Sequence, residues 1–285
     1  MIRDTQAYFH WDPSPDLFVI PYFEHPLRWY GAFFALGFVL SYYLVIKILR
    51  KNFQSQEKAT KLADALLLYI VFATIIGARL GHVFFYSWPI YQRDPWSILR
   101  VWEGGLASHG AAVAIVLSIF FFVWRKKRSF PGLSSVFLLD LICIPSALAG
   151  AFIRMGNFFN QELVGTPTSL PWAVVFGHPA HGGPVLPRHP VQIYESFFYL
   201  FTFLFLYVLW KKKIYHLGRG ALFSLFMVLV FSFRFFAEFF KEAQSMLLDE
   251  NAFLSMGHYL SIPFVLGGSI YFLRVRKRDD VPNQS

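Results

Sequence analysis

The stretch LSSVFLLDLICIPSALAGAFIR, residues 133–154, decides what kind of chain this is. Residues 133–153 form an apolar run of about the 20 residues that a helix needs to cross a bilayer, and the run closes on Arg154. A charge in hydrocarbon costs about 2.5–3.5 kcal/mol on insertion scales, so an arginine at such a place usually faces a polar cavity. The stretch predicts a membrane-spanning helix that carries a cation to one end of the span.

Six further apolar stretches resemble this one. Together they predict seven transmembrane helices, over residues 28–49, 62–85, 106–124, 133–153, 191–210, 221–240 and 254–273. The composition agrees, because 56% of the 285 residues are hydrophobic and only 15% are charged, against about 25% in soluble domains. We expect a single, all-α integral membrane domain covering residues 1–285.

The basic residues predict the orientation of these helices. They gather in alternate connecting segments, at residues 47–61, 125–128, 211–219 and 274–278. Lysine and arginine are enriched in the cytoplasmic loops of membrane proteins. The C-terminus is therefore predicted in the cytoplasm and the N-terminus outside. The net charge of +9 is explained by this topology, so we expect no nucleic-acid partner.

Two external segments are long enough to form structures of their own. Residues 86–105 hold Trp88, Trp96 and Trp102 and predict an arm in the membrane interface, where tryptophan is enriched. Residues 155–190 are rich in Gly, Pro and His and predict a small head with a strand within residues 172–176.

Polar side chains from six of the predicted helices converge on the outer half of the bilayer. The predicted depths of these residues suggest one site that is open to the outer leaflet. They are Tyr30, Arg79, His109, Arg154, Gln192, Tyr194, Glu195 and Arg234.

Some of these positions have structural alternatives. Arg79 could extend to the interface as long basic side chains do. Arg234 and Glu238 stand at i and i+4, where opposite charges on one helix neutralise each other. Asp140 could be the structural partner of an arginine or a reacting group. The histidines lack the spacing of a metal site, so we expect no metal.

The segment RMGNFFNQELVG, residues 154–165, resembles the signature of the bacterial prolipoprotein diacylglyceryl transferase family. Six other blocks follow the family's pattern in the same order. They are LRWYG (27–31), GARLGHVFFY (77–86), EGGLASHGA (103–111), HPVQIYES (189–196), FRFFAEFFK (233–241) and LSMGHYLSIP (254–263).

The resemblance implies an enzyme of the bacterial cytoplasmic (inner) membrane with a periplasmic head. Such enzymes move the diacylglyceryl group of phosphatidylglycerol onto the thiol of a lipobox cysteine in a preprolipoprotein. The products are a thioether-linked lipid and glycerol phosphate. The implied partners are phosphatidylglycerol, preprolipoprotein signal peptides and membrane lipids, and no cofactor is expected.

The resemblance also implies roles for individual residues. Arg154 and Arg234 would clamp the phosphate, and Glu238 would orient Arg234. His109 is the candidate base for the thiol, with Tyr30 as its partner or as a lipid ligand. Asn157, Asn160 and Glu162 would shape the head-group pocket, and Gly165 would permit a tight turn. Structural or supporting roles are expected for Arg79, Asp140, Gln192, Tyr194 and Glu195.

A multi-pass transporter of an organic anion or lipid is the alternative. Transporters need polar residues toward both membrane faces and often contain inverted repeats. Apart from Asp140, the predicted inner half is almost entirely apolar, and no repeat is evident. The sequence therefore favours the transferase.

Overall fold

The computed structural model describes residues 8–20, 25–101, 105–130, 132–180, 182–242 and 254–279. Each of the seven predicted spans corresponds to a helix. These are α1 Trp29–Phe53, α2 Gln56–Phe85, α4 Ser108–Lys126, α5 Ser135–Phe159, α6 Val191–Lys211, α7 Ala221–Glu238 and α8 Met256–Asp279. Within the described ranges, six of these helices are long and apolar enough to cross a membrane, and α8 is not among the six.

Several helix ends differ from the predicted ones. Helix α2 begins six residues early, at Gln56, because the Ser55 side chain caps it by accepting a hydrogen bond from the backbone N–H of Lys58. Helix α5 continues to Phe159, so the first residues of the predicted head are helical. Arg154 and Asn157 consequently share one helix, three residues apart.

The chain divides into two compact units. The first contains residues Met1–Ser41 and Cys143–Ser285, and the second contains Tyr42–Ile142. Within the first unit, α7 packs against both α6 and α8, and these three helices run side by side. Within the second unit, α2 packs along α4.

Glycines permit the close packing of α2 against α4. Gly77 and Gly81 are four residues apart on α2, and both face Gly110 of α4. A Cβ atom at Gly81 would lie 2.8 Å from Gly110 Cα, and a Cβ at Gly77 would lie 2.6 Å from the Gly110 carbonyl oxygen. Small residues at this spacing let helix backbones approach closely in membrane proteins.

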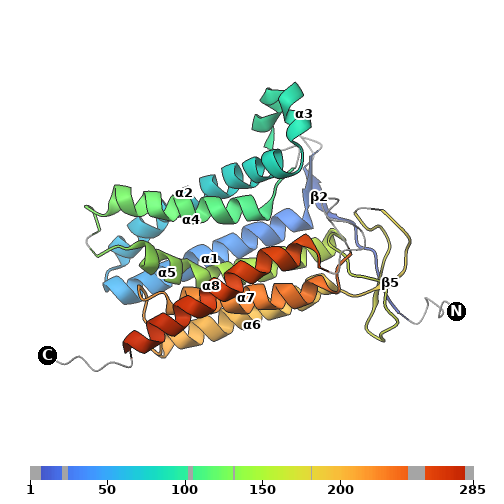
Figure 1. Cartoon of the computed structure of the whole chain (residues 1–285). Coiled ribbons are helices and arrows are strands. Elements are labelled where there is room, and N and C mark those ends of the chain that lie inside the picture. The colour runs from blue at the N-terminus through green and yellow to red at the C-terminus, as the bar shows by residue number, and fades with distance from the viewer. Residues whose placement is uncertain are drawn as a thin grey trace. The chain divides into compact units, whose positions relative to one another are not determined.

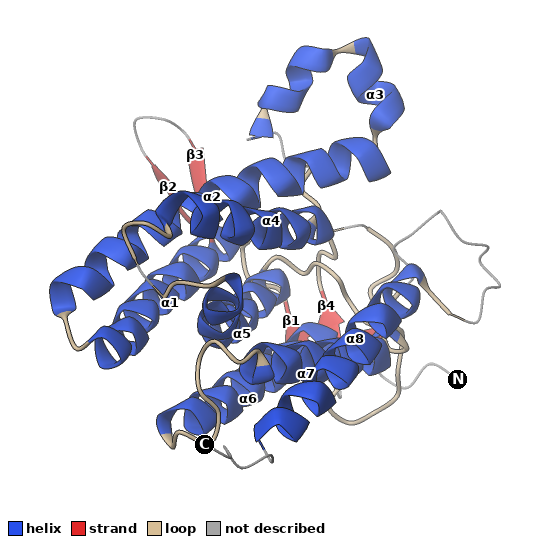
Figure 2. Cartoon of the chain, turned by 60° about the vertical axis from the view of Figure 1, so that its left-hand side comes forward, coloured by secondary structure: helices blue, strands red, loops and turns tan. Residues whose placement is uncertain are grey.

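An arm follows α2 in the second unit. It contains α3, Trp88–Arg93, and the 3₁₀ helix η2, Pro95–Leu99, and α3 lies beyond the end of α2 in both views (Figures 1 and 2). Arg79 of α2 donates from Nε to the Ile98 carbonyl at 2.9 Å and from Nη2 to the Ser97 and Arg100 carbonyls. Its guanidinium therefore ties the arm to α2.

The head contains strands that the sequence analysis did not predict. β1, Phe9–Trp11, pairs in parallel with β4, Val174–Phe176, and β4 pairs antiparallel with β5, Pro187–Arg188. β2, Asp16–Ile20, and β3, His25–Arg28, form a separate antiparallel pair. The expected strand within residues 172–176 is confirmed by β4. Residues 9–11, which precede the predicted head in the sequence, supply the third strand of the sheet that β4 and β5 form.

A small aromatic core holds the head to the end of α5. Phe158, Val164, Val174 and Phe176 are buried together. Trp11 stacks on Phe158 with ring centroids 4.6 Å apart, and its Nε1 donates to the Phe158 carbonyl at 3.1 Å. Burying the apolar faces of these rings keeps the segment after Arg154 in a defined place.

Candidate functional site

A buried carboxylate lies between two cations at the centre of the first unit. Glu195 of α6 has no exposed side-chain surface. Its Oε2 lies 3.1 Å from Arg154 Nε, and its Oε1 accepts from Lys241 Nζ at 2.8 Å. A buried charge requires such partners, because leaving it alone in a medium of low polarity is costly. Glu195 therefore pairs with Arg154 through one carboxylate oxygen and with Lys241 through the other.

Lys241 was not among the predicted site residues. It follows α7 directly, and its side chain is only 6% exposed. The signal for it in the sequence was weak, since a lysine at the end of an apolar helix is more often an interfacial residue. The structure brings it to Glu195 because the α7 end lies beside the segment that contains Gly165.

The ionic cluster continues toward the start of α8. Glu238 Oε2 lies 3.7 Å from Lys241 Nζ, and Glu238 Oε1 accepts from Ser255 Oγ at 2.8 Å. Ser255 Oγ also lies 3.0 Å from His258 Nδ1. Glu238 was expected to orient Arg234, whereas the structure gives its carboxylate Lys241 and Ser255 as partners.

Arg234, the second predicted clamp residue, lies on α7 and is half-buried. It precedes Glu238 by four residues and Lys241 by seven, so it belongs to the segment that carries these two members of the charged cluster.

Hydrogen bonds link Arg154 to the residues that follow α5. Arg154 Nη1 donates to Asn157 Oδ1 at 3.3 Å, and Asn157 Nδ2 donates to Glu162 Oε2 at 2.9 Å. The other carboxylate oxygen of Glu162 accepts from Asn160 Nδ2 at 2.9 Å. Gln192 Nε2 donates to the Glu162 backbone carbonyl at 2.6 Å. The predicted head-group residues thus form one network.

Gly165 has a different structural reason from the expected tight turn. Its backbone forms an isolated antiparallel bridge with Lys241, and a Cβ atom there would lie 2.8 Å from the Phe240 carbonyl oxygen. The left-handed backbone positions in this segment belong instead to Gln161 (φ 53°) and Leu163 (φ 58°). Gly165 is required by the close approach of two backbones.

Tyr30 and Tyr194 lie at the edges of the cluster. Tyr30 of α1 contacts α5 at Gly156, where an added Cβ would lie 3.0 Å from Tyr30 Cδ2, and its hydroxyl is within electrostatic range of Glu162 and Arg154. The Tyr194 hydroxyl accepts from Trp172 Nε1 at 2.8 Å. Tyr194 therefore ties α6 to the head.

Three predicted residues lie in the second unit. His109 contacts the rings of Phe85 and Tyr86, with centroids 5.3 and 5.7 Å away. Arg79 is 4% exposed and donates to backbone carbonyl groups of the arm. Asp140 is completely buried in α5.

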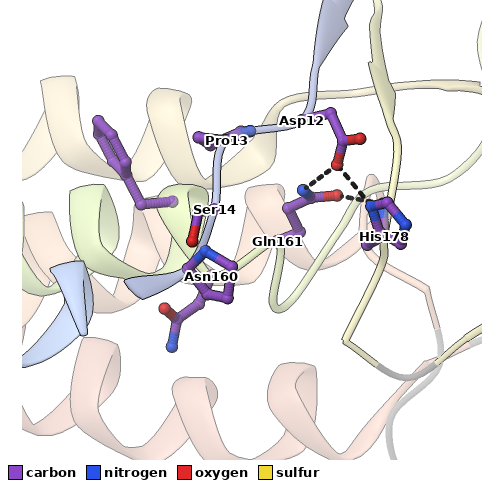
Figure 3. A pocket seen from close by; sticks show the side chains of 8 residues that line it. Asp12, Pro13, Ser14, Asn160, Gln161 and His178 are labelled. Carbon is purple, nitrogen blue, oxygen red and sulfur yellow. Dashed lines mark hydrogen bonds and ion pairs between the residues drawn. The ribbon is translucent and has the colours of Figure 1, made fainter. Parts of the chain in front are cut away.

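A second group of polar side chains, missed by the sequence analysis, lines a cavity in the head (Figure 3). Asp12 Oδ1 accepts from Gln161 Nε2 at 3.2 Å and lies 2.7 Å from His178 Nδ1. The bonds from His178 and Gln161 hold the pKa of the Asp12 carboxyl below its ordinary value. Asp12 and His178 are distant in sequence, so neither motif nor spacing indicates this pair.

These features define a class of protein. Six bilayer-length helices and a buried cluster of arginine, lysine and glutamate describe a multi-pass membrane protein with a charged site among its helices. The particular family follows from comparison. The profile of the family described as prolipoprotein diacylglyceryl transferase matches residues 15–274, and the chain belongs to that family.

Curated relatives support this membership. A phosphatidylglycerol–prolipoprotein diacylglyceryl transferase of Chloroherpeton thalassium is 39% identical over 282 residues, which cover 99% of this chain and 100% of the relative. The transferase of the same name from Tolumonas auensis is 42% identical, covering 87% of this chain and 90% of its own. The one from Protochlamydia amoebophila is 36% identical, with 92% and 93% covered.

Proposed function

We propose that this protein transfers the sn-1,2-diacylglyceryl group of phosphatidylglycerol to the thiol of the lipobox cysteine of preprolipoproteins. A thioether forms and glycerol phosphate leaves. The observation that carries the proposal is Arg154 held between Glu195 and Asn157, within the segment RMGNFFNQELVG. The family and the names of the relatives support the same reaction.

The arginines act on the leaving phosphate. The reaction breaks a carbon–oxygen bond, and the bonding electrons pass to a phosphate oxygen. Donors placed where negative charge develops lower the barrier most, and the planar fork of arginine matches phosphate oxygens better than lysine does. Glu195 engages Arg154 at Nε and so orients its terminal nitrogens. Arg234 supplies the second cation.

The attacking group is the substrate thiol. Its free pKa is about 8.5, so little thiolate exists at neutral pH. Either a base must remove the proton or a strongly positive site, such as the two arginines, must lower the pKa of the thiol. His109 is proposed as that base, and Tyr30 as its partner or as a lipid ligand. The sulfur then attacks the glycerol carbon as the phosphate oxygen departs. His109→Gln should lower turnover and leave lipid binding intact, whereas unchanged turnover would exclude the base role.

The proposed setting is the bacterial cytoplasmic membrane. Helix α8 serves as the seventh span, the N-terminus and head face outward, and the C-terminus is cytoplasmic. The basic segments at residues 125–128 and 211–219 support this orientation. Phosphatidylglycerol would then enter laterally, with its head group at the depth of the outer leaflet, and signal peptides and membrane lipids would be the other partners.

The transferase proposal is tested with purified protein, phosphatidylglycerol and a lipobox peptide. Peptide mass and released glycerol phosphate are followed together. We expect a gain of one diacylglyceryl group per peptide with matching phosphate release, and loss of both in Arg154→Ala. A folded wild-type protein that produces neither would contradict the proposal and would leave lipid or anion flux to be measured instead.

A further inference from the structure

The cavity in the head is lined by groups that, apart from Asn160, have no role in the proposed chemistry. It has a volume of about 430 Å³ and is lined by residues 12–15, Phe159, Asn160, Gln161 and His178 (Figure 3). Gln161 is 3% exposed and holds both walls, since its Nε2 donates to Asp12 and its Oε1 accepts the backbone N–H of His178 at 2.7 Å. The pocket therefore has a fixed shape.

The lining offers hydrogen-bond acceptors. Asn160 contributes to the lining, and its Nδ2 is fixed by Glu162 at 2.9 Å. Asp12 adds a carboxylate that is 48% exposed.

The charge of the pocket lining favours the polypeptide substrate over the phosphate of the lipid substrate. The eight lining residues include Asp12 and His178 and no lysine or arginine. The phosphate of a lipid head group would meet the carboxylate of Asp12, and among the described lining residues only His178, which already lies 2.7 Å from that carboxylate, could offset the repulsion. An extended polypeptide brings backbone N–H donors instead, and Pro13, Pro15 and Phe159 offer apolar surface to its side chains.

The position of the pocket indicates which part of a polypeptide would enter it. Asn160 belongs both to this lining and to the network that joins Glu162, Asn157 and Arg154. The pocket begins at Phe159, the last residue of α5, and so lies beyond the end of that apolar helix. The apolar part of a signal peptide precedes its processing site, so the residues after the acceptor cysteine are the ones that reach this end.

We propose that the head pocket binds the segment of the polypeptide substrate that directly follows the acceptor cysteine. Asp12, whose carboxylate is half-exposed, favours a basic side chain in this segment over an acidic one. This inference rests on the proposed function, because it names a subsite for the acceptor of the same reaction.

The test uses three lipobox peptides that are identical up to the cysteine. One ends there, one continues with Ser-Lys-Ser-Lys, and one continues with Ser-Glu-Ser-Glu. KM is measured for each peptide and for phosphatidylglycerol. The wild-type protein should prefer the lysine peptide over the glutamate peptide by about three- to fivefold in KM, the size expected of an exposed ion pair.

Variants of Asp12 assign this preference to the pocket. Asp12→Asn keeps the acceptor for Gln161 and should abolish the preference, and Asp12→Lys should reverse it. Neither should change KM for phosphatidylglycerol. The matched control is Asp94→Lys, because Asp94 is 49% exposed and also holds one ion pair, with Arg100 in the arm. This control should keep the wild-type preference.

The outcomes separate the inference from the reaction. If Asp12→Asn retains the preference, the inference is overturned. It is also overturned if the Asp12 variants change KM for phosphatidylglycerol, since the pocket would then belong to the lipid. A wild-type protein that modifies none of the three peptides contradicts the proposed function itself, and this subsite with it.

Discussion

Glu195 shows how single residues create the site. One buried carboxylate holds Arg154 from α5 and Lys241 from the end of α7. Without the Glu195 carboxylate, the positive charges of Arg154 and Lys241 would repel each other in the buried interior. The carboxylate lets both cations stay buried, and one terminal nitrogen of Arg154 donates to Asn157. The two ion pairs of Glu195 therefore position the cations rather than add net stability to the fold.

The coupling of Glu195 and Lys241 can be measured with a double-mutant cycle. Glu195→Gln leaves Lys241 and Arg154 without their shared carboxylate and should cost about 3–5 kcal/mol of unfolding free energy, the usual loss when one partner of a buried pair is removed. Lys241→Met combined with Glu195→Gln should cost less than the sum of the single changes. Thermal or denaturant unfolding in detergent gives these values.

The control for this cycle is an exposed ion pair of equal length. Arg100 Nη2 and Asp94 Oδ2 are also 2.8 Å apart, in the arm. Arg100→Gln and Asp94→Asn should act almost additively, because water screens their interaction. Additivity in the buried cycle as well would show that Glu195 and Lys241 are not coupled.

At the scale of elements, the close approach of the α2 and α4 backbones explains why the family blocks contain glycine at certain positions. The block GARLGHVFFY places Gly77 and Gly81 on α2, where they meet Gly110 of α4. This approach positions the helix that bears Arg79, and Arg79 in turn holds the arm through three carbonyl groups within residues 97–100. The arm thus depends on a helix pair that tolerates no extra methyl group.

A single methyl group tests this packing. Gly81→Ala would place its Cβ 2.8 Å from Gly110 Cα, so the helices must separate, and we expect a loss of about 1–3 kcal/mol, typical of overpacking. Gly267→Ala on α8 is the matched control, since nothing lies within 4 Å of its Cβ position and alanine favours a helix. Equal melting temperatures for the two variants would disprove the tight contact.

At the scale of the whole molecule, the orientation that we propose from the basic segments assigns those segments and the head to opposite sides of a membrane. Ser129 lies among the basic residues after α4, and Ser169 lies in the head, and both are exposed. The native Cys143 is buried. These positions allow the proposed orientation to be tested with single cysteines in a Cys143→Ala background.

Labelling with a membrane-impermeant maleimide on intact spheroplasts should distinguish the two sides. Ser169→Cys should react in intact spheroplasts because the head is proposed to face outward, while Ser129→Cys should react only after lysis. The reverse pattern would invert the topology. Detergent-solubilised protein, in which both cysteines should react, is the control for accessibility.

The features that depend on neighbouring residues in the chain can be predicted from the sequence of this protein. The contacts between residues that are distant in the chain cannot. The apolar runs and the family blocks predict the long helices and the family, because helix formation and membrane insertion depend on local composition. The proposed clamp, the orientation and the roles of His109 and Tyr30 are predictions from that same sequence information.

Only the tertiary structure assigns partners across distant segments. It joins β1 to β4, Glu195 to Lys241 and Asp12 to His178, and it replaces the expected turn at Gly165 by a backbone bridge to Lys241. Such pairs carry no local signal, since each residue alone matches an ordinary loop, interface or helix end. They arise when chain packing brings buried charges and open strand edges together, and each must then find a partner.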